Sequence, residues 1–82
     1  MQIKTKSDLV GEWTATLIGD KESWAAKKGE KHTLTITISN ADRTRNNIEV
    51  FVHTSYYGSG DYQYFETIED FLKNWGKLKR AK

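Results

Sequence analysis

The sequence predicts an α+β fold: a small two-layer domain in which an antiparallel sheet of about four strands carries a C-terminal amphipathic helix packed on one face. Two observations predict the sheet, namely segments in which apolar and polar residues alternate, and turn residues between those segments. A third observation, an apolar stripe with spacings of three and four near the C-terminus, predicts the helix. Because the 82 residues contain no linker and no repeat, residues 1–82 are expected to form a single domain.

The central strands are expected at residues 33–39 and 48–54, where the alternation is most regular. Residues 40–47 between them are rich in Asn and Asp, so the pair is expected to form a hairpin with a long tip. A glycine-bearing turn at residues 57–61 then leads into a short strand at residues 62–65. The face of the central pair that is expected to lie under the helix consists of Leu34, Ile36, Ile38, Ile48, Val50 and Val52.

The helix is expected to begin after Thr67, a good N-cap residue, with Glu69 and Asp70 in the first turn, where the helix dipole favours acidic side chains. Gly76 either ends this helix or lies inside it, and the basic residues 77–82 are expected to form a frayed end. The apolar stripe that packs on the sheet consists of Ile68, Phe71, Leu72 and Trp75.

The N-terminal third of the chain is less regular. Residues 12–18 alternate well enough to predict a further strand, and residues 7–10 predict a short helical turn capped by Ser7. Residues 20–28 fit either a short helix or an irregular strand. In both cases Trp24 is expected to anchor this segment to the core, because so large an apolar side chain is usually buried.

The composition argues against an enzyme. The chain has no Cys, and the only side chains of a type that can act as a base near neutral pH are His32 and His53, which lie on two different predicted strands. Neither histidine belongs to a nucleophile elbow or to a metal-binding helical pair, so both are expected to be imidazoles on the sheet surface. We expect no catalytic residue, no metal and no cofactor.

Charge is unevenly distributed along the chain. The net charge is +2, but residues 1–31 carry +1, residues 32–70 carry −4 and residues 71–82 carry +5. The chain is therefore not a polycation that coats nucleic acid. Because the N-terminus lacks the apolar run of a signal peptide and no segment is apolar enough to span a membrane, we expect a cytoplasmic protein without membrane contacts.

The outward face of the sheet is the first candidate site. Phe51 and His53 alternate with the core positions, and Phe65 is expected to join them from the next strand, while Arg43 and Arg45 occupy the hairpin tip. An aromatic patch with arginines at its rim is typical of a protein interface, so a larger protein partner is expected. The same arrangement can stack the bases of a single-stranded nucleic acid, which remains an alternative.

The basic C-terminal end is the second candidate site. Lys73, Lys77 and Arg80 follow one another at spacings of four and three, which would place them on the outer face of the predicted helix. Such a stripe can contact the phosphates of a nucleic acid. An ordinary solvated helix face is the simpler interpretation, since Glu69 precedes Lys73 by four residues and can pair with it.

Two short segments resemble known proteins. Gly11-Glu12-Trp13 resembles the Gly-X-Trp entry of lipocalin-like barrels, in which the Trp closes the barrel floor; a ligand cavity of that kind would need eight strands, hence a dimer of this chain. Residues 67–75 look loosely like short accessory proteins of phages and mobile elements of Gram-positive bacteria, some of which inhibit host defence systems.

The resulting functional expectations fall into three classes. The first is a non-enzymatic protein-binding module, with an anti-CRISPR-type inhibitor of host defence as its most specific form. The second is a nucleic-acid-binding domain, and the third is a dimeric binder of a small apolar ligand.

Overall fold

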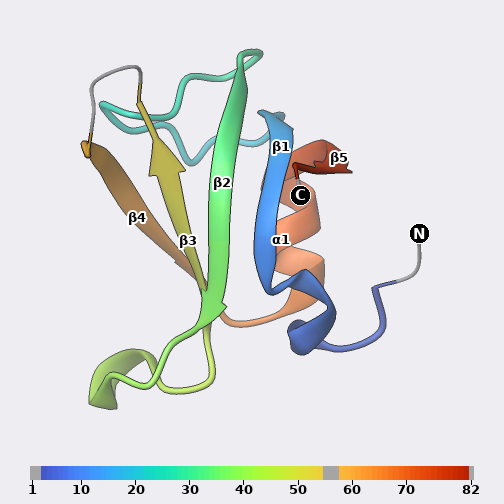
Figure 1. Cartoon of the computed structure of the whole chain (residues 1–82), viewed down its shortest axis with the longest axis vertical. Coiled ribbons are helices and arrows are strands. Elements are labelled where there is room, and N and C mark those ends of the chain that lie inside the picture. Colours follow the sequence, from blue (N-terminus) through green and yellow to red (C-terminus); the bar gives the residue numbers. More distant parts are fainter. Residues whose placement is uncertain (1–2, 55–57, 82) are drawn as a thin grey trace.

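The computed structural model describes residues 3–54 and 58–81. Its five strands form one antiparallel sheet in the order β4-β3-β2-β1-β5, so the first strand lies between the second and the last (Figure 1). The elements, in chain order, are a 3-10 helix η1 at Lys6–Leu9, β1 at Gly11–Leu17, β2 at Lys31–Ile38, a 3-10 helix η2 at Asp42–Thr44, β3 at Ile48–His53, β4 at Gly60–Phe65, α1 at Ile68–Asn74 and β5 at Trp75–Arg80.

The apolar positions of the alternating segments build the core. In β2 and β3 the partners Leu34 and Val52, and Ile36 and Val50, lie opposite each other and are fully buried. Burial removes their side chains from water, which is the main driving force for folding in a chain of this size. The predicted strands at 12–18, 33–39, 48–54 and 62–65 therefore exist, with ends that differ by one or two residues. The beginning of the predicted turn at 57–61 lies outside the described residues.

The predicted fold class is wrong at the C-terminus. The fold is mostly sheet: it has five strands, and α1 is a helix of 7 residues that does not cover a sheet face. Thr67 caps this helix as predicted, since its side chain accepts a hydrogen bond from the Asp70 backbone. The helix ends at Trp75, whose backbone is extended, and the residues expected to fray pair with β1 as strand β5. Leu72, expected in the apolar stripe, is 41% exposed.

A β-bulge explains why strand β5 was not predicted from the sequence. Thr14 pairs with Lys79 while Thr16 pairs with Gly76, so β5 contains one more residue than β1 over this stretch, and Lys77 takes a positive φ of 53°. The extra residue brings Trp75 and Leu78 to the same side of the strand, although a regular strand would place residues three apart on opposite sides. A spacing of three between apolar residues imitates helical periodicity, and the prediction followed it.

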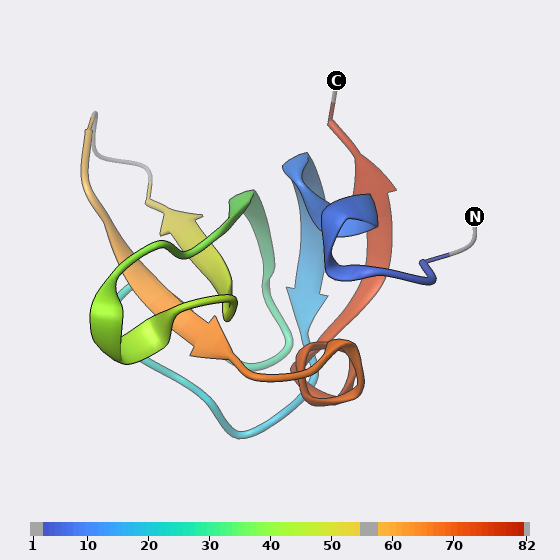
Figure 2. The ribbon, with the colours of Figure 1, turned by 90° about the horizontal axis from the view of Figure 1, so that it is seen from below.

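The helix α1 connects the two edges of the curled sheet. Figure 2 shows α1 end-on, between the end of β4 and the beginning of β5. Its one buried side chain, Phe71, packs edge-to-face on Phe65 of β4 with ring centroids 5.5 Å apart. Nearby, Trp75 donates from Nε1 to Oε1 of the buried Gln63 at 3.1 Å, and Nε2 of Gln63 donates to the Lys21 carbonyl at 2.8 Å. Gln63 thus joins β4, β5 and the loop of residues 18–30.

Trp13 occupies the opposite end of the core. It is fully buried, and its Nε1 donates to the Leu9 carbonyl at 2.7 Å. The guanidinium of Arg80 lies 4.0 Å from the Trp13 ring centre and donates to the Val10 carbonyl at 2.8 Å. Gly11, with φ of 131°, leaves room for this arginine, because a Cβ there would lie 2.6 Å from Nη1. The Gly-X-Trp segment is therefore structural, within a sheet of five strands.

The 3-10 helix η1 corresponds to the short turn expected at residues 7–10. Its N-cap is Thr5, two residues before the predicted cap Ser7. The carboxylate of Asp8 accepts hydrogen bonds from the backbone N–H groups of Thr5 and Lys4, and these bonds hold the pKa of Asp8 below its ordinary value. Asp8 therefore stabilises the entry into β1 in its ionised form.

Candidate binding surface

Four rings in mutual contact cover the outward side of β3 and β4, and we call them the outer aromatic strip: His53, Phe51, Tyr62 and Tyr64. The centroids of His53 and Phe51 lie 4.8 Å apart, those of Phe51 and Tyr62 4.9 Å apart, and those of Tyr62 and Tyr64 6.4 Å apart. Tyr62 is 54% exposed and Tyr64 36%. These distances are typical of stabilising aromatic pairs, so the strip is an ordered surface of large side chains.

Neighbouring strands hold both ends of the strip. At one end, the Thr35 hydroxyl of β2 and Nε2 of His53 lie 2.7 Å apart in a hydrogen bond. In the middle, Phe51 lies over Gly60 of β4 so closely that a Cβ on this glycine would be 2.5 Å from Cζ of the ring. At the other end, Glu49 accepts from the Thr37 hydroxyl at 2.9 Å and from the Tyr64 hydroxyl at 3.2 Å.

The bond between Tyr64 and Glu49 places an acidic group within the strip. Partial desolvation of the phenol, together with this bond and the negative charge of Glu49, raises the pKa of Tyr64 above its ordinary value. Tyr64 therefore stays protonated at neutral pH and continues to donate to the carboxylate. The strip therefore ends in a carboxylate that two hydroxyl groups hold in place.

Phe65 does not belong to this surface, and its expected position there is wrong. In the register of β3 and β4, Ile48 lies opposite Phe65 and Phe51 lies opposite Tyr62. Phe65 is therefore on the core side and only 2% exposed, whereas Tyr62 and Tyr64 point outward. Since successive side chains of a strand alternate between faces, a register taken one residue off exchanges the two sets. Phe51 and His53 do face outward as expected.

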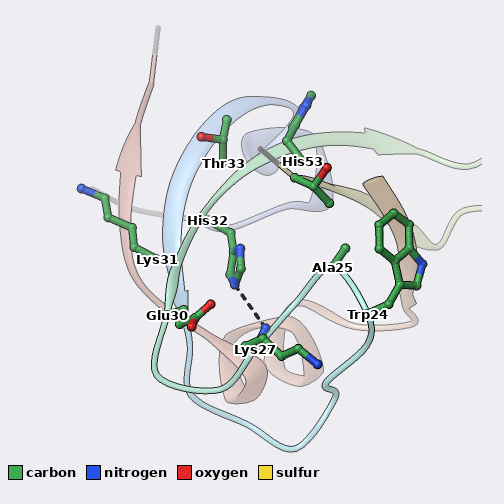
Figure 3. A pocket seen from close by; sticks show the side chains of 9 residues that line it. Trp24, Ala25, Lys27, Glu30, Lys31, His32, Thr33 and His53 are labelled. Atoms are coloured by element: carbon green, nitrogen blue, oxygen red, sulfur yellow. Dashed lines mark hydrogen bonds between the residues drawn. The ribbon is translucent and has the colours of Figure 1, made fainter. Parts of the chain in front are cut away.

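A hollow of about 510 Å³ adjoins the His53 end of the strip. It lies between the loop of residues 18–30 and the adjoining ends of β2 and β3, with Trp24 on one side and His53 on the other (Figure 3). Its wall consists of Trp24, Ala25, His32, Thr33, His53 and Thr54, together with Lys27, Glu30 and Lys31.

Trp24 is the largest departure from the sequence-based picture of this region. It was expected to anchor the loop to the core, but it is 62% exposed. Residues 20–28 form neither a helix nor a strand, and the small side chains of Ala25 and Ala26 are buried in its place. Backbone hydrogen bonds hold the loop instead. Among them, the N–H of Ser23 donates to the carbonyl of Ala26, and the N–H of Ala26 donates to the carbonyl of Ser23. Trp24 is thus a second exposed aromatic group near the strip.

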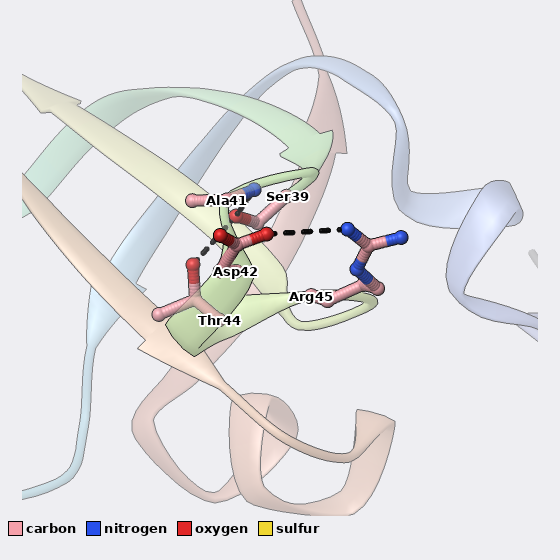
Figure 4. Close-up of polar contacts among 5 residues, drawn as sticks. All are labelled: Ser39, Ala41, Asp42, Thr44 and Arg45. Carbon is pink, nitrogen blue, oxygen red and sulfur yellow. Dashed lines mark hydrogen bonds and ion pairs between the residues drawn. The ribbon is translucent and has the colours of Figure 1, made fainter.

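The predicted arginine tip lies far from this hollow. Figure 1 shows the loop of residues 39–47 at the lower end of the sheet and the loop of residues 18–30 at the upper end. Within the tip, Arg45 pairs with Asp42 at 3.3 Å, and the Ser39 and Thr44 hydroxyls are 2.6 Å apart (Figure 4). Arg43 is exposed. The arginines and the hollow therefore flank the aromatic strip from opposite ends.

The three basic residues of the alternative site do not share a helix face. Lys73 lies on α1 with its Nζ 3.6 Å from Oε1 of Glu69, which is the ordinary pairing of residues four apart. Lys77 occupies the bulge of β5, and Arg80 is held against Trp13 and the carbonyls of Val10 and Asp8. The geometric premise of a phosphate-binding helix stripe is therefore wrong.

The free edge of β4 is partly occupied by side chains of the chain itself. The Tyr62 N–H donates to the Asp61 carboxylate at 2.9 Å, and Lys21 donates to the Tyr64 carbonyl at 3.2 Å. An edge whose backbone groups are already bonded is a poor template for an added strand. The side-chain face of the hairpin, and not its edge, is the accessible surface.

The two histidines have structural partners. His32 accepts at Nε2 from the Lys27 N–H at 3.2 Å and contacts Trp75 edge-to-face, with ring centroids 5.9 Å apart. His53 belongs to the strip. Among residues 3–54 and 58–81, no group of three or more His, Asp or Glu side chains lies close enough to hold a metal ion.

No protein-family model matches the chain, no curated protein matches its sequence and no solved structure matches its fold. In the part of the chain that the structure describes, no helix has the length and apolar character needed to cross a membrane.

Sequence reasoning missed three residues of the candidate surface: Trp24, Tyr62 and Tyr64. A signal was available for the tyrosines, because they alternate with Gln63 and Phe65 in one strand and one of the two pairs had to face outward. No local signal marked Trp24, whose exposure results from the path of an irregular loop.

Proposed function

We propose that this chain is a protein-binding domain that docks its partner on the outer aromatic strip. The observation that carries the proposal is the strip itself: a chain of 82 residues leaves a row of four contacting rings on the outward side of the sheet, with Trp24 exposed on the adjoining loop. Tyr and Trp are enriched among the residues that dominate binding energy at protein interfaces, because they bury a large area and lose little conformational entropy.

The layout of the surface supports the same function. The strip has a hollow at one end and the exposed Arg43 tip beyond the other, which gives an aromatic centre with polar surroundings. A nucleic acid is not the expected ligand of the strip. Residues 48–66 contain three acidic residues and no Lys or Arg, so this surface would repel phosphate groups. The more specific expectation, inhibition of a host defence protein, stays a prediction from the resemblance of residues 67–75.

Affinity capture from a nuclease-treated lysate, followed by mass spectrometry, tests the proposal. The bait is the intact chain, compared with Tyr62→Ser, which removes the most exposed ring of the strip. The matched control is Leu72→Ser, which removes a side chain of similar exposure on α1. We expect a protein that the wild type and Leu72→Ser retain and Tyr62→Ser loses. Equal capture by all three baits, or material lost only on nuclease treatment, would contradict the proposal.

A further inference from the structure

The charge of the β3–β4 hairpin restricts what can dock on the strip. Residues 48–66 carry Glu49, Asp61 and Glu66 and no Lys or Arg, so this hairpin has a net charge of −3 in a chain whose net charge is +2. Of the three acidic groups, Glu49 lies within the strip and is bonded to Tyr64. Asp61 accepts from the Tyr62 backbone N–H, and the exposed Glu66 follows the end of β4. The strip is therefore aromatic and acidic together.

The rings themselves favour a cation. The faces of Phe and Tyr rings carry negative electrostatic potential, which attracts Lys and Arg side chains placed over them. This chain already uses that attraction twice: Arg80 lies over Trp13, and Lys21 lies over Phe65 at 4.5 Å. Tyr62 and Tyr64, which are stacked at an interplanar angle of 16°, offer similar ring faces, and no cation of the described residues lies over them.

The cations nearest to the strip are engaged elsewhere or lie at its margins. Lys21 is bonded to the Tyr64 carbonyl and lies on the core-side ring of Phe65, and Arg45 is paired with Asp42. Lys27 and Lys31 line the hollow that adjoins the His53 end of the strip. None of them neutralises Glu49, whose two oxygens accept only from neutral hydroxyl groups.

We infer that the partner presents a basic segment to the strip, with Arg or Lys side chains over Tyr62 and Tyr64 and one cation paired with Glu49. The inference rests on the proposed function and specifies its partner: a protein segment rich in Arg or Lys. The pairing of Glu49 with neutral hydroxyls keeps the carboxylate in place without cancelling its charge, so a guanidinium finds a positioned acceptor. The charge of the hairpin steers such a segment to this face.

The test uses two synthetic peptides of equal length, one alternating Gly and Arg and one alternating Gly and Glu, both with blocked ends. They are titrated into the isotopically labelled chain up to roughly millimolar concentration, and amide chemical shifts are followed by NMR. We expect the Arg peptide to shift amides of β3 and β4, an effect that weakens as salt is added. The Glu peptide is expected to leave these amides unchanged.

Variants assign the effect to the strip. Glu49→Gln removes the charge but keeps one oxygen acceptor for one of the two hydroxyl groups, and its amide N–H can donate to the oxygen of the other. We expect the dissociation constant of the Arg peptide to rise about two- to fivefold. The matched control Glu69→Gln removes an exposed carboxylate on α1. It is expected to leave the dissociation constant of the Arg peptide unchanged. Circular dichroism of both variants verifies that they are folded.

Three outcomes of the peptide titration would overturn the inference. The first is equal binding of both peptides, the second is Arg-peptide shifts that map away from β3 and β4, and the third is no shift at all. Self-association of the chain that Glu49→Gln abolishes would also overturn it, because the strip would then take the basic residues 71–82 of a second copy. If the inference fails while capture still depends on Tyr62, the proposed function stands with a partner of different charge.

Discussion

Two sets of aromatic side chains differ in this molecule, although their residue types are similar. The inner set is buried, and each of its polar ring atoms has a protein partner. In the outer set three rings contact one another along the strip, Trp24 lies apart from them, and Trp24, Tyr62 and Tyr64 are exposed. The inner set is Trp13, Phe65, Phe71 and Trp75, and the outer set is Trp24, Phe51, Tyr62 and Tyr64. The inner set therefore stabilises the fold, whereas the outer set leaves aromatic surface exposed that a partner can cover.

The largest effect is expected from replacing one tryptophan of each set. Trp75→Ala should lower the free energy of unfolding by about 3–5 kcal/mol, because it leaves a cavity in the core and an unpaired oxygen on Gln63. Trp24→Ala should change the free energy of unfolding by less than about 0.5 kcal/mol, because its side chain is 62% exposed. Urea unfolding followed by circular dichroism measures both values.

The milder variant Trp75→Phe keeps the comparison measurable where Trp75→Ala does not fold. It retains most of the apolar volume and removes the Nε1 donor to Gln63. A loss of stability in Trp24→Ala as large as that in Trp75→Phe would mean that the exposed tryptophan also belongs to the core.

An intermediate effect is expected at Gln63, which gives the inner set its polar contact. Gln63→Leu keeps the size of the side chain but leaves Nε1 of Trp75 and the Lys21 carbonyl without their partner. We expect the free energy of unfolding to fall by about 1–3 kcal/mol, the cost of leaving buried polar groups unpaired.

The double variant Gln63→Leu with Trp75→Phe separates this bond from packing. Since Trp75→Phe already removes the donor, the two losses should add up to more than the loss in the double variant. Strict additivity in urea unfolding would show that the bond between Gln63 and Trp75 contributes nothing.

The smallest effect is expected in the outer set, from Tyr64→Phe. The variant loses one partly exposed hydrogen bond to Glu49, so the free energy of unfolding at neutral pH should change by less than about 0.5 kcal/mol. A change above about 1 kcal/mol would show that the outer aromatic strip stabilises the fold as the inner set does.

The stabilities of wild type and Tyr64→Phe are also expected to depend differently on pH in the alkaline range. The pKa of Tyr64 is higher in the folded chain than in the unfolded chain, so its stabilising contribution is complete below about pH 10, the ordinary range of tyrosine. The contribution is lost as the pH rises through the folded value. Wild type should therefore lose slightly more stability than Tyr64→Phe above about pH 10. A smaller loss in wild type, measured by urea unfolding across this range, would contradict the assigned bond.

The sequence predicted the sheet well wherever period-two alternation is uninterrupted. Leu34, Ile36, Val50 and Val52 all lie in the core, because alternate residues of a strand share one face and in both strands one of the two faces is mainly aliphatic. The prediction from the sequence failed at β5. There the bulge at Lys77 puts two apolar residues that are three positions apart on the same side of the strand, a spacing that is typical of a helix. A bulge depends on the opposite strand, so no local pattern could reveal it.

The candidate surface was predicted in part. Phe51 and His53 face outward because they alternate with core residues of their own strand. Phe65 was assigned to the wrong face, since the register of β4 depends on its pairing with β3 and not on its own short sequence. Trp24 was expected in the core on account of its size, but the loop path presents Ala25 and Ala26 to the core instead.

Local sequence was sufficient to predict the two central strands, the Thr67 cap and the acidic character of the β3–β4 hairpin. These features are local, because periodicity, capping and charge are properties of neighbouring residues. Only the tertiary structure decided that the C-terminus pairs with β1, which aromatic residues are buried, and that Arg80 covers Trp13. These features depend on contacts between residues far apart in the chain, and such contacts exist only once the sheet has curled around its core.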